Sequence, residues 1–148
     1  MYLVLLNLVS FVFPDPPGPP GRPKALDWGP SSCDLCWAPP ETDGGAEITH
    51  YHIEMLEKEL SCWESGLKIN VEDVRISQGQ MYAACPGLTE GFTYKFRVKA
   101  YNVGGPSLPS PPSEPFITAI NRSGTYPSIL QNVFLRYNQK HIGITSRF

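Results

Sequence analysis

The sequence predicts an all-β fold, a seven-stranded antiparallel β-sandwich, from three observations. Residues 94–100 alternate without a miss between bulky apolar side chains and cations, which is typical of a half-buried antiparallel strand. Ahead of this strand, Leu88, Gly91 and Tyr94 stand three residues apart, which predicts a tyrosine corner whose phenol bonds to upstream backbone. Short apolar runs separated by proline and glycine clusters recur along the chain, with no convincing helix among them.

The individual strands follow from the same alternation, taken in chain order. A short first strand is predicted over Ala25–Trp28, and Ser32–Trp37 follows with Cys33, Leu35 and Trp37 inward. After a turn cluster at 39–45, Ile48–Leu56 places Tyr51, Ile53 and Met55 inward and His50, His52 and Glu54 outward. Further strands are predicted around Trp63, over Met81–Leu88 with Ala83, Cys85 and Leu88 inward, and over Glu114–Ile120. The strand at 94–100 directs Tyr94, Phe96, Val98 and Ala100 inward and Lys95, Arg97 and Lys99 outward.

The two ends of the chain differ from this domain, which is expected over residues 14–120. Residues 1–13 are almost wholly apolar and carry no charge; they are too short to span a bilayer as a helix and lack the basic start of a signal peptide. We interpret them as an apolar leader or the edge of a gene model. Residues 14–23 are rich in proline and predict a stiff linker approaching the domain. Residues 121–148 form a basic tail, either a short partner- or membrane-binding helix or non-native sequence.

Charge and motif content argue against several classes of function. The segment 14–120 holds 8 basic and 14 acidic residues, and an acidic module is a poor nucleic-acid binder. Cys33 and Cys36 form a C-x-x-C motif, but their odd spacing on a strand sends the side chains to opposite faces, so they cannot share a metal. His50 and His52 share a face without a third ligand. We therefore expect no cofactor, no metal and no catalysis, and we expect Cys33 and Cys85 to be buried free thiols.

The order of motifs resembles a fibronectin type III domain, which has an immunoglobulin-like β-sandwich fold. The stretches carrying the resemblance include DGG with IT-Y-IE at 43–54 and L-EG--Y-FRV-AYN-GGPS-PS at 88–110. The residues in these stretches are similar to those in modules of giant sarcomeric proteins of the titin, twitchin and projectin group. The resemblance implies that Trp37 is the buried core tryptophan, that Tyr51 packs in the core, and that Leu88 and Tyr94 form the corner. The stretch between Trp63 and Leu88 is about five residues longer than the family usually runs, so the connection over 64–80 cannot be placed by analogy.

The function implied by this resemblance is a non-catalytic structural and docking module of a muscle-type scaffold in the cytoplasmic sarcomere. The partners implied are neighbouring immunoglobulin or fibronectin type III modules and myosin or actin filaments, with no membrane contact expected. The candidate partner-binding face is Lys95, Arg97 and Lys99, expected opposite or diagonal to His50, His52 and Glu54; solubility alone is the other reading of these cations. The competing hypothesis is a module of a cell-surface or secreted adhesion or receptor protein, for which the glycosylation sequon at Asn121 would matter.

Overall fold

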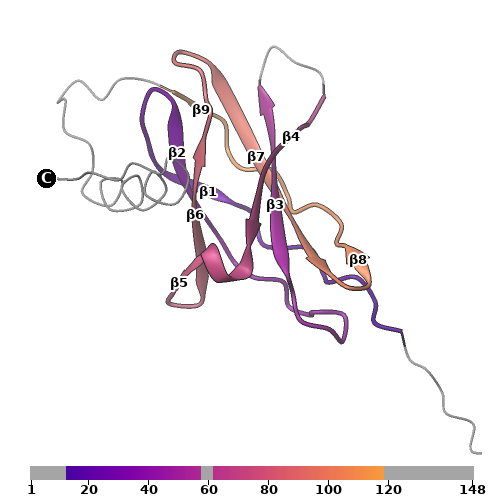
Figure 1. Ribbon diagram of the computed structural model, residues 1–148. Helices are drawn as coiled ribbons and strands as arrows, with labels where there is room; N and C mark the ends of the chain where they lie inside the picture. Colours follow the sequence, from indigo (N-terminus) through magenta and orange to yellow (C-terminus); the bar gives the residue numbers. More distant parts are fainter. Residues whose placement is uncertain (1–12, 58–61, 119–148) are drawn as a thin grey trace, which may run out of the picture.

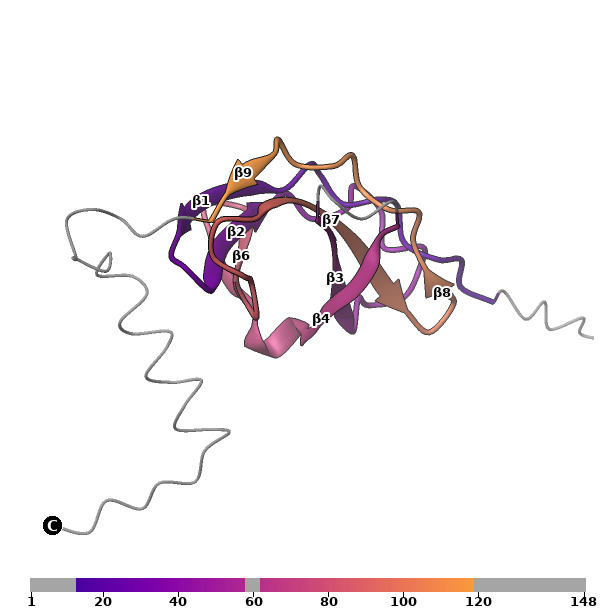
Figure 2. The same cartoon turned by 90° about the horizontal axis from the view of Figure 1, so that it is seen from above.

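Two antiparallel β-sheets face each other in the computed structural model, which describes residues 13–57 and 62–118 (Figure 1). The first sheet has the order β1 (Lys24–Trp28), β2 (Ser32–Trp37), β6 (Gln80–Pro86) and β5 (Arg75–Ser77). The second sheet runs β4 (Glu64–Asn70), β3 (His50–Glu57), β7 (Thr93–Asn102) and β8 (Gly105–Pro106), and β9 (Phe116–Ile117) also pairs with β7. The view from above separates the β1-β2-β6 layer from the β3-β4-β7 layer (Figure 2). The predicted all-β sandwich is confirmed.

The core lies between the two sheets, and inward residues of β2, β3 and β7 supply most of it. The sequence-predicted core residues are all 5% exposed or less: Trp37, Tyr51, Ile53, Leu88, Tyr94, Phe96 and Val98. Trp37 and Tyr51 meet edge to face across the core, with ring centroids 5.5 Å apart. Because Nε1 of Trp37 is buried without a hydrogen-bond partner among the described residues, this side chain stabilises the core through packing.

A hydrogen bond from the backbone to the Tyr94 phenol holds the turn before β7. The Thr89 N–H donates to Tyr94 Oη over 3.0 Å, five residues upstream. Gly91 occupies the left-handed region at φ +81°, and its N–H donates to the Thr118 carbonyl over 2.8 Å. The corner therefore ties the start of β7 to the residue that follows β9.

The connection over 64–80 forms two strands and a helical turn. It consists of β4, a 3₁₀ turn (Val71–Asp73) and β5, and Trp63 comes directly before β4. Within β4, Leu67 packs against the core and Ile69 belongs to it, alternating with exposed Lys68 and Asn70. This segment, which analogy with the family did not place, thus follows the period of a strand.

The last strand departs from the prediction for Glu114–Ile120, because only Phe116–Ile117 pair as a strand within the described residues. The proline-rich stretch before these two residues runs alongside β7 and is hydrogen-bonded to it by three serines spaced three residues apart. Ser107, Ser110 and Ser113 donate their N–H groups to the carbonyls of Ala100, Val98 and Phe96. In return, the N–H groups of those three β7 residues donate to the serine Oγ atoms, each over 2.9 Å. Serine hydroxyls thereby take the place of backbone carbonyls along this edge of β7.

The proline-rich segment expected as an approach to the domain lies along it instead. The N–H groups of Asp15, Gly18 and Gly21 donate to carbonyls of the 38–44 turn, each over 2.9 Å. Each of these bonds is followed two residues later by a buried proline: Pro17, Pro20 and Pro23. A Cβ on Gly21 would stand 2.9 Å from the Ala38 Cβ, so the close approach depends on glycine. The segment contributes directly to the packing of the module.

Several expectations fall outside the described residues: residues 1–12 of the leader, the end of the predicted last strand at 119–120, and the tail at 121–148 with its Asn121 sequon. Within residues 13–57 and 62–118, no helix has the length and apolar character needed to cross a membrane.

Candidate functional site

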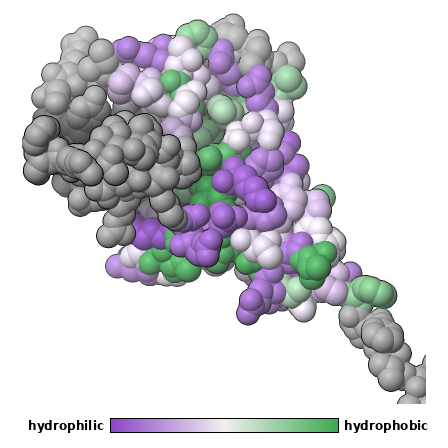
Figure 3. All heavy atoms as spheres, viewed as in Figure 1, coloured by the Kyte–Doolittle hydropathy of each residue, from purple (hydrophilic) through white to green (hydrophobic). Residues whose placement is uncertain are grey.

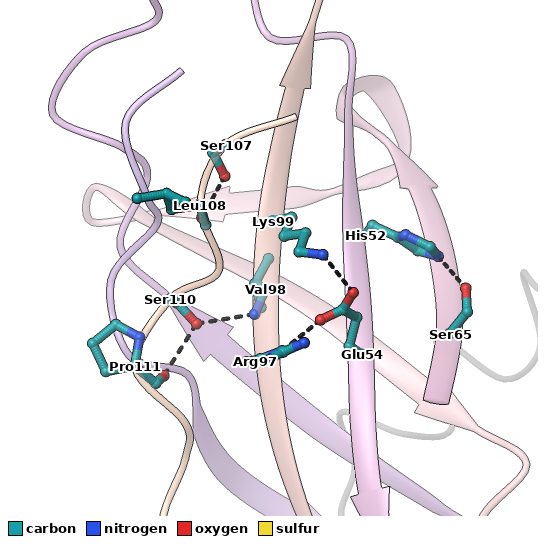
Figure 4. A network of polar contacts seen from close by, with 10 residues as sticks. All are labelled: His52, Glu54, Ser65, Arg97, Val98, Lys99, Ser107, Leu108, Ser110 and Pro111. Atoms are coloured by element: carbon teal, nitrogen blue, oxygen red, sulfur yellow. Dashed lines mark hydrogen bonds and ion pairs between the residues drawn. The ribbon is translucent and has the colours of Figure 1, made fainter. Parts of the chain in front are cut away.

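The candidate partner-binding face is the outer surface of β4, β3 and β7, where the strand register sets every neighbour (Figure 4). On β3 and β7, His52 pairs with Lys99, Glu54 with Arg97, and Leu56 with Lys95. The outward residues of the two strands therefore lie directly opposite one another, as expected from their order in the sandwich.

Glu54 lies between two of the three cations and pairs with both. One carboxylate oxygen accepts from Arg97 Nε over 2.5 Å, and the other accepts from Lys99 Nζ over 2.7 Å. Burial alone would raise the pKa of Glu54, but the hydrogen bonds from Lys99 and Arg97 outweigh it and lower the pKa below its usual value. All three side chains are less than one-quarter exposed, so this is a half-buried, charge-compensated cluster.

Arg97 also lies over the ring of Trp63. The guanidinium carbon lies 4.4 Å from the centroid of the Trp63 ring, a cation–π contact. Lys95 is exposed, and no ion pair among the described residues involves it. The face thus presents one exposed lysine beside a fixed arginine–tryptophan pair, and tryptophan and arginine are enriched at the energetic centres of protein interfaces.

The other end of the face carries the two histidines in defined positions. His50 stacks on Tyr101 with ring centroids 4.5 Å apart, and His52 Nε2 lies 2.8 Å from Ser65 Oγ. Burial, together with Lys68 and His52, lowers the pKa of His50, which favours the neutral form of this ring. The histidines thus contribute an aromatic, hydrogen-bonded surface here.

The outer face of the first sheet is different in charge. Asp27 on β1 lies directly opposite Asp34 on β2. Burial raises the pKa of Asp34, the Asp27 charge raises it further, and Arg75 acts in the opposite direction. Arg75 itself lies over the Tyr82 ring at 4.7 Å. Two like charges paired across strands oppose folding, so this face carries an electrostatic cost.

The cysteines and histidines form no metal centre in the part of the chain that the structure describes. No group of three or more histidine, cysteine, aspartate or glutamate side chains is placed to hold an ion there. Cys33 pairs with Cys85 on the inward side, whereas Cys36 pairs with Tyr82 on the outer side, so the C-x-x-C thiols leave opposite faces.

Figure 3 shows the surface hydropathy on one side of the molecule. The hydrophobic residues visible there stand in small separate groups among hydrophilic ones.

Sequence reasoning did not anticipate the Arg97–Trp63 contact or the double role of Glu54. The alternation placed Glu54 and the cations on the outer face, but only the register decides that one carboxylate meets two of them. Trp63 lies outside the strands, and no sequence signal specified which side chain its ring covers.

Known proteins with similar sequences or folds include muscle proteins, and one domain family matches most of the chain. The model of the fibronectin type III domain matches residues 18–116. The chain is 34% identical over 103 residues to cardiac-type myosin-binding protein C of Mus musculus, a match covering 70% of this chain and 8% of that protein. It is 36% identical over 100 residues to the titin homolog of Caenorhabditis elegans, covering 68% of this chain and, to the nearest per cent, 0% of that protein.

A solved structure of titin domains A168–A170 is similar in fold, with a TM-score of 0.62 and 33% identity. The match covers 72% of this chain and 33% of that chain. The chain therefore corresponds in length to a small fraction of the relatives it matches. The match to the domain model, the two facing sheets and the corner around Tyr94 agree, and the chain belongs to the fibronectin type III family.

Proposed function

We propose that this chain contributes a non-catalytic spacer and protein-docking module to a large modular muscle protein of the cytoplasmic sarcomere. The observation that carries this proposal is the similarity across the module to myosin-binding protein C and to the titin homolog, at 34% and 36% identity. These relatives are much longer than the chain, which favours a unit that acts within a row of modules.

The docking surface is the outer face of β3 and β7 around Lys95, Arg97 and Trp63. Arg97 is fixed between Glu54 and the Trp63 ring, so a partner that contacts it pays little ordering entropy. Lys95 adds an exposed charge beside this pair. The partner we propose is an acidic surface on a neighbouring immunoglobulin or fibronectin type III module, or on a myosin or actin filament.

The substitution Lys95→Glu tests this surface without changing the ion pairs of Glu54. Reversing Arg97 or Lys99 as well would leave Glu54 facing new carboxylates, so lost binding could not be separated from lost stability. The matched control is Lys24→Glu, which makes the same charge change at an exposed lysine on β1, in the other sheet.

Co-sedimentation of the full chain with myosin and actin filaments at low and high salt tests the proposal. We expect the parent and Lys24→Glu to bind alike at low salt, and Lys95→Glu to bind about 5-fold more weakly, equivalent to roughly 1 kcal/mol. The difference should shrink at high salt because screening removes it. Binding to neither filament, or equal binding by both variants, would remove filament docking from the proposed function.

The sequon Asn121-Arg122-Ser123 favours the competing role, a module of a cell-surface or secreted adhesion or receptor protein. That role predicts an occupied glycan and oxidised cysteines in the native protein. Thiol titration of the native protein under denaturing, non-reducing conditions separates the two proposals. Four thiols per chain support the sarcomeric module, and two support the extracellular one.

A further inference from the structure

Two of the four cysteines lie opposite each other at the centre of the first sheet. Cys33 on β2 and Cys85 on β6 are direct partners in the antiparallel register. Their side chains point into the core, where they are 0% and 1% exposed, and both are free thiols. The strands thus bring together two oxidisable groups that are 52 residues apart in the sequence.

The backbone spacing at this position suits a disulfide. Directly opposed residues of antiparallel strands have Cα atoms about 4.5 Å or about 5.5 Å apart, depending on the type of pair. Disulfides span Cα separations of roughly 4.4–6.8 Å, so either type of pair falls within the range. Cys36 offers no such geometry to Cys85, because it lies on the opposite face and three residues farther along β2, about 10 Å away.

The folded module keeps the pair unreactive. Burial raises the pKa of the Cys85 thiol to about 12, and burial together with Cys85 raises the pKa of Cys33 as well. The thiolate is the nucleophile in disulfide exchange, and neither sulfur is open to a reagent in solution. Cys62, in contrast, is exposed. Reaction at the central pair therefore requires the sheet to open.

We propose that Cys33 and Cys85 form a latent cross-strand disulfide site, closed by a small disulfide oxidant such as oxidised glutathione when the sandwich opens. The Cys33 thiolate attacks one glutathione sulfur, forms a mixed disulfide, and releases a glutathione thiolate that takes up the proton lost by Cys33. The Cys85 thiolate then attacks the Cys33 sulfur and releases the second glutathione. Two cysteine thiols are oxidised by two electrons, and one glutathione disulfide is reduced to two thiols.

A variant that keeps only this pair, Cys36→Ala with Cys62→Ala in the full chain, tests the site. In native buffer with oxidised glutathione, the intact mass should stay unchanged over hours. At the denaturation midpoint, the chain should lose the mass of two hydrogens and carry no glutathione. After the denaturant is removed, the oxidised chain should refold and melt about 10 °C above its reduced form, and reduction should abolish the difference.

The matched control is Cys33→Ala with Cys62→Ala, which leaves Cys36 and Cys85 and encloses a loop of similar length. Oxidised at the midpoint, this control should fail to regain the native fold, because the native register separates its two thiols. Three results would overturn the proposal: only glutathione adducts in the first variant, an oxidised first variant that melts at or below its reduced form, or rapid oxidation of that variant in native buffer.

Discussion

Removing the Ser110 hydroxyl should destabilise the module more than its position in a proline-rich stretch suggests. Val98 at the centre of β7 donates its N–H to Ser110 Oγ over 2.9 Å, and Val98 and Ser110 are 0% and 3% exposed. Ser110→Ala leaves this buried N–H without a partner. An unsatisfied buried donor costs about 1–3 kcal/mol, whereas the Pro111 carbonyl, which also loses the hydroxyl, is exposed and can bond to water.

We therefore expect Ser110→Ala to lower the free energy of unfolding by about 2 kcal/mol, which is roughly 10 °C in Tm for a domain of this size. Ser77→Ala, at an exposed position on β5, is the matched control and should change stability by less than about 0.5 kcal/mol. Urea unfolding measures both variants, and hydrogen exchange should show faster exchange of the Val98 amide in Ser110→Ala alone. Equal midpoints for the two variants, with Val98 protection unchanged, would refute the reasoning.

Three further outcomes can be checked by the same unfolding measurements. Trp37→Ala should lose about 3–5 kcal/mol because the ring is 1% exposed, and a loss below about 1 kcal/mol would contradict its place in the core. Tyr94→Phe should lose about 1 kcal/mol because the Thr89 N–H loses its acceptor, and a variant as stable as the parent would show that this bond contributes nothing. Asp34 has a raised pKa in the folded state, so its stabilising contribution is present at low pH and is lost as the pH rises through that pKa. Asp34→Asn should accordingly stabilise the module by roughly 0.2–1 kcal/mol at pH 7, with little difference left at pH 3; a less stable variant at pH 7 would contradict the sign.

The alternation of side chains was sufficient to predict the central strands. The strand predicted over Ser32–Trp37 has the bounds of β2, and the strand predicted over Ile48–Leu56 overlaps β3, because in both strands apolar residues directed into the core alternate with residues directed away from it. The segment over 64–70 carried the same signal in Leu67 and Ile69, although analogy with the family did not place it. Period-two reasoning thus identifies a strand wherever packing is one-sided.

The remaining features depend on contacts between distant segments. The serines at 107, 110 and 113 repeat every three residues, so a search for period two does not detect their pairing with β7. The composition of the proline-rich segment at 14–23 predicts a linker. Its packing depends on hydrogen bonds from its N–H groups to carbonyls of the distant 38–44 turn, which composition does not reveal. On the outer face, composition alone suggested three similar cations. In the structure Glu54 forms ion pairs with Arg97, which lies opposite it, and with Lys99, which lies diagonal to it, whereas Lys95 is left exposed.

The serine and proline stretch beside β7 also bears on how the module resists aggregation. Of the nine residues from 107 to 115, four are prolines without an N–H, and the three serines direct theirs to β7. Only Leu108 and Glu114 keep a backbone donor that another chain could use. An edge with so few donors cannot template a further strand. Copies of such modules held close together are therefore protected at this edge against joining into a continuous intermolecular sheet.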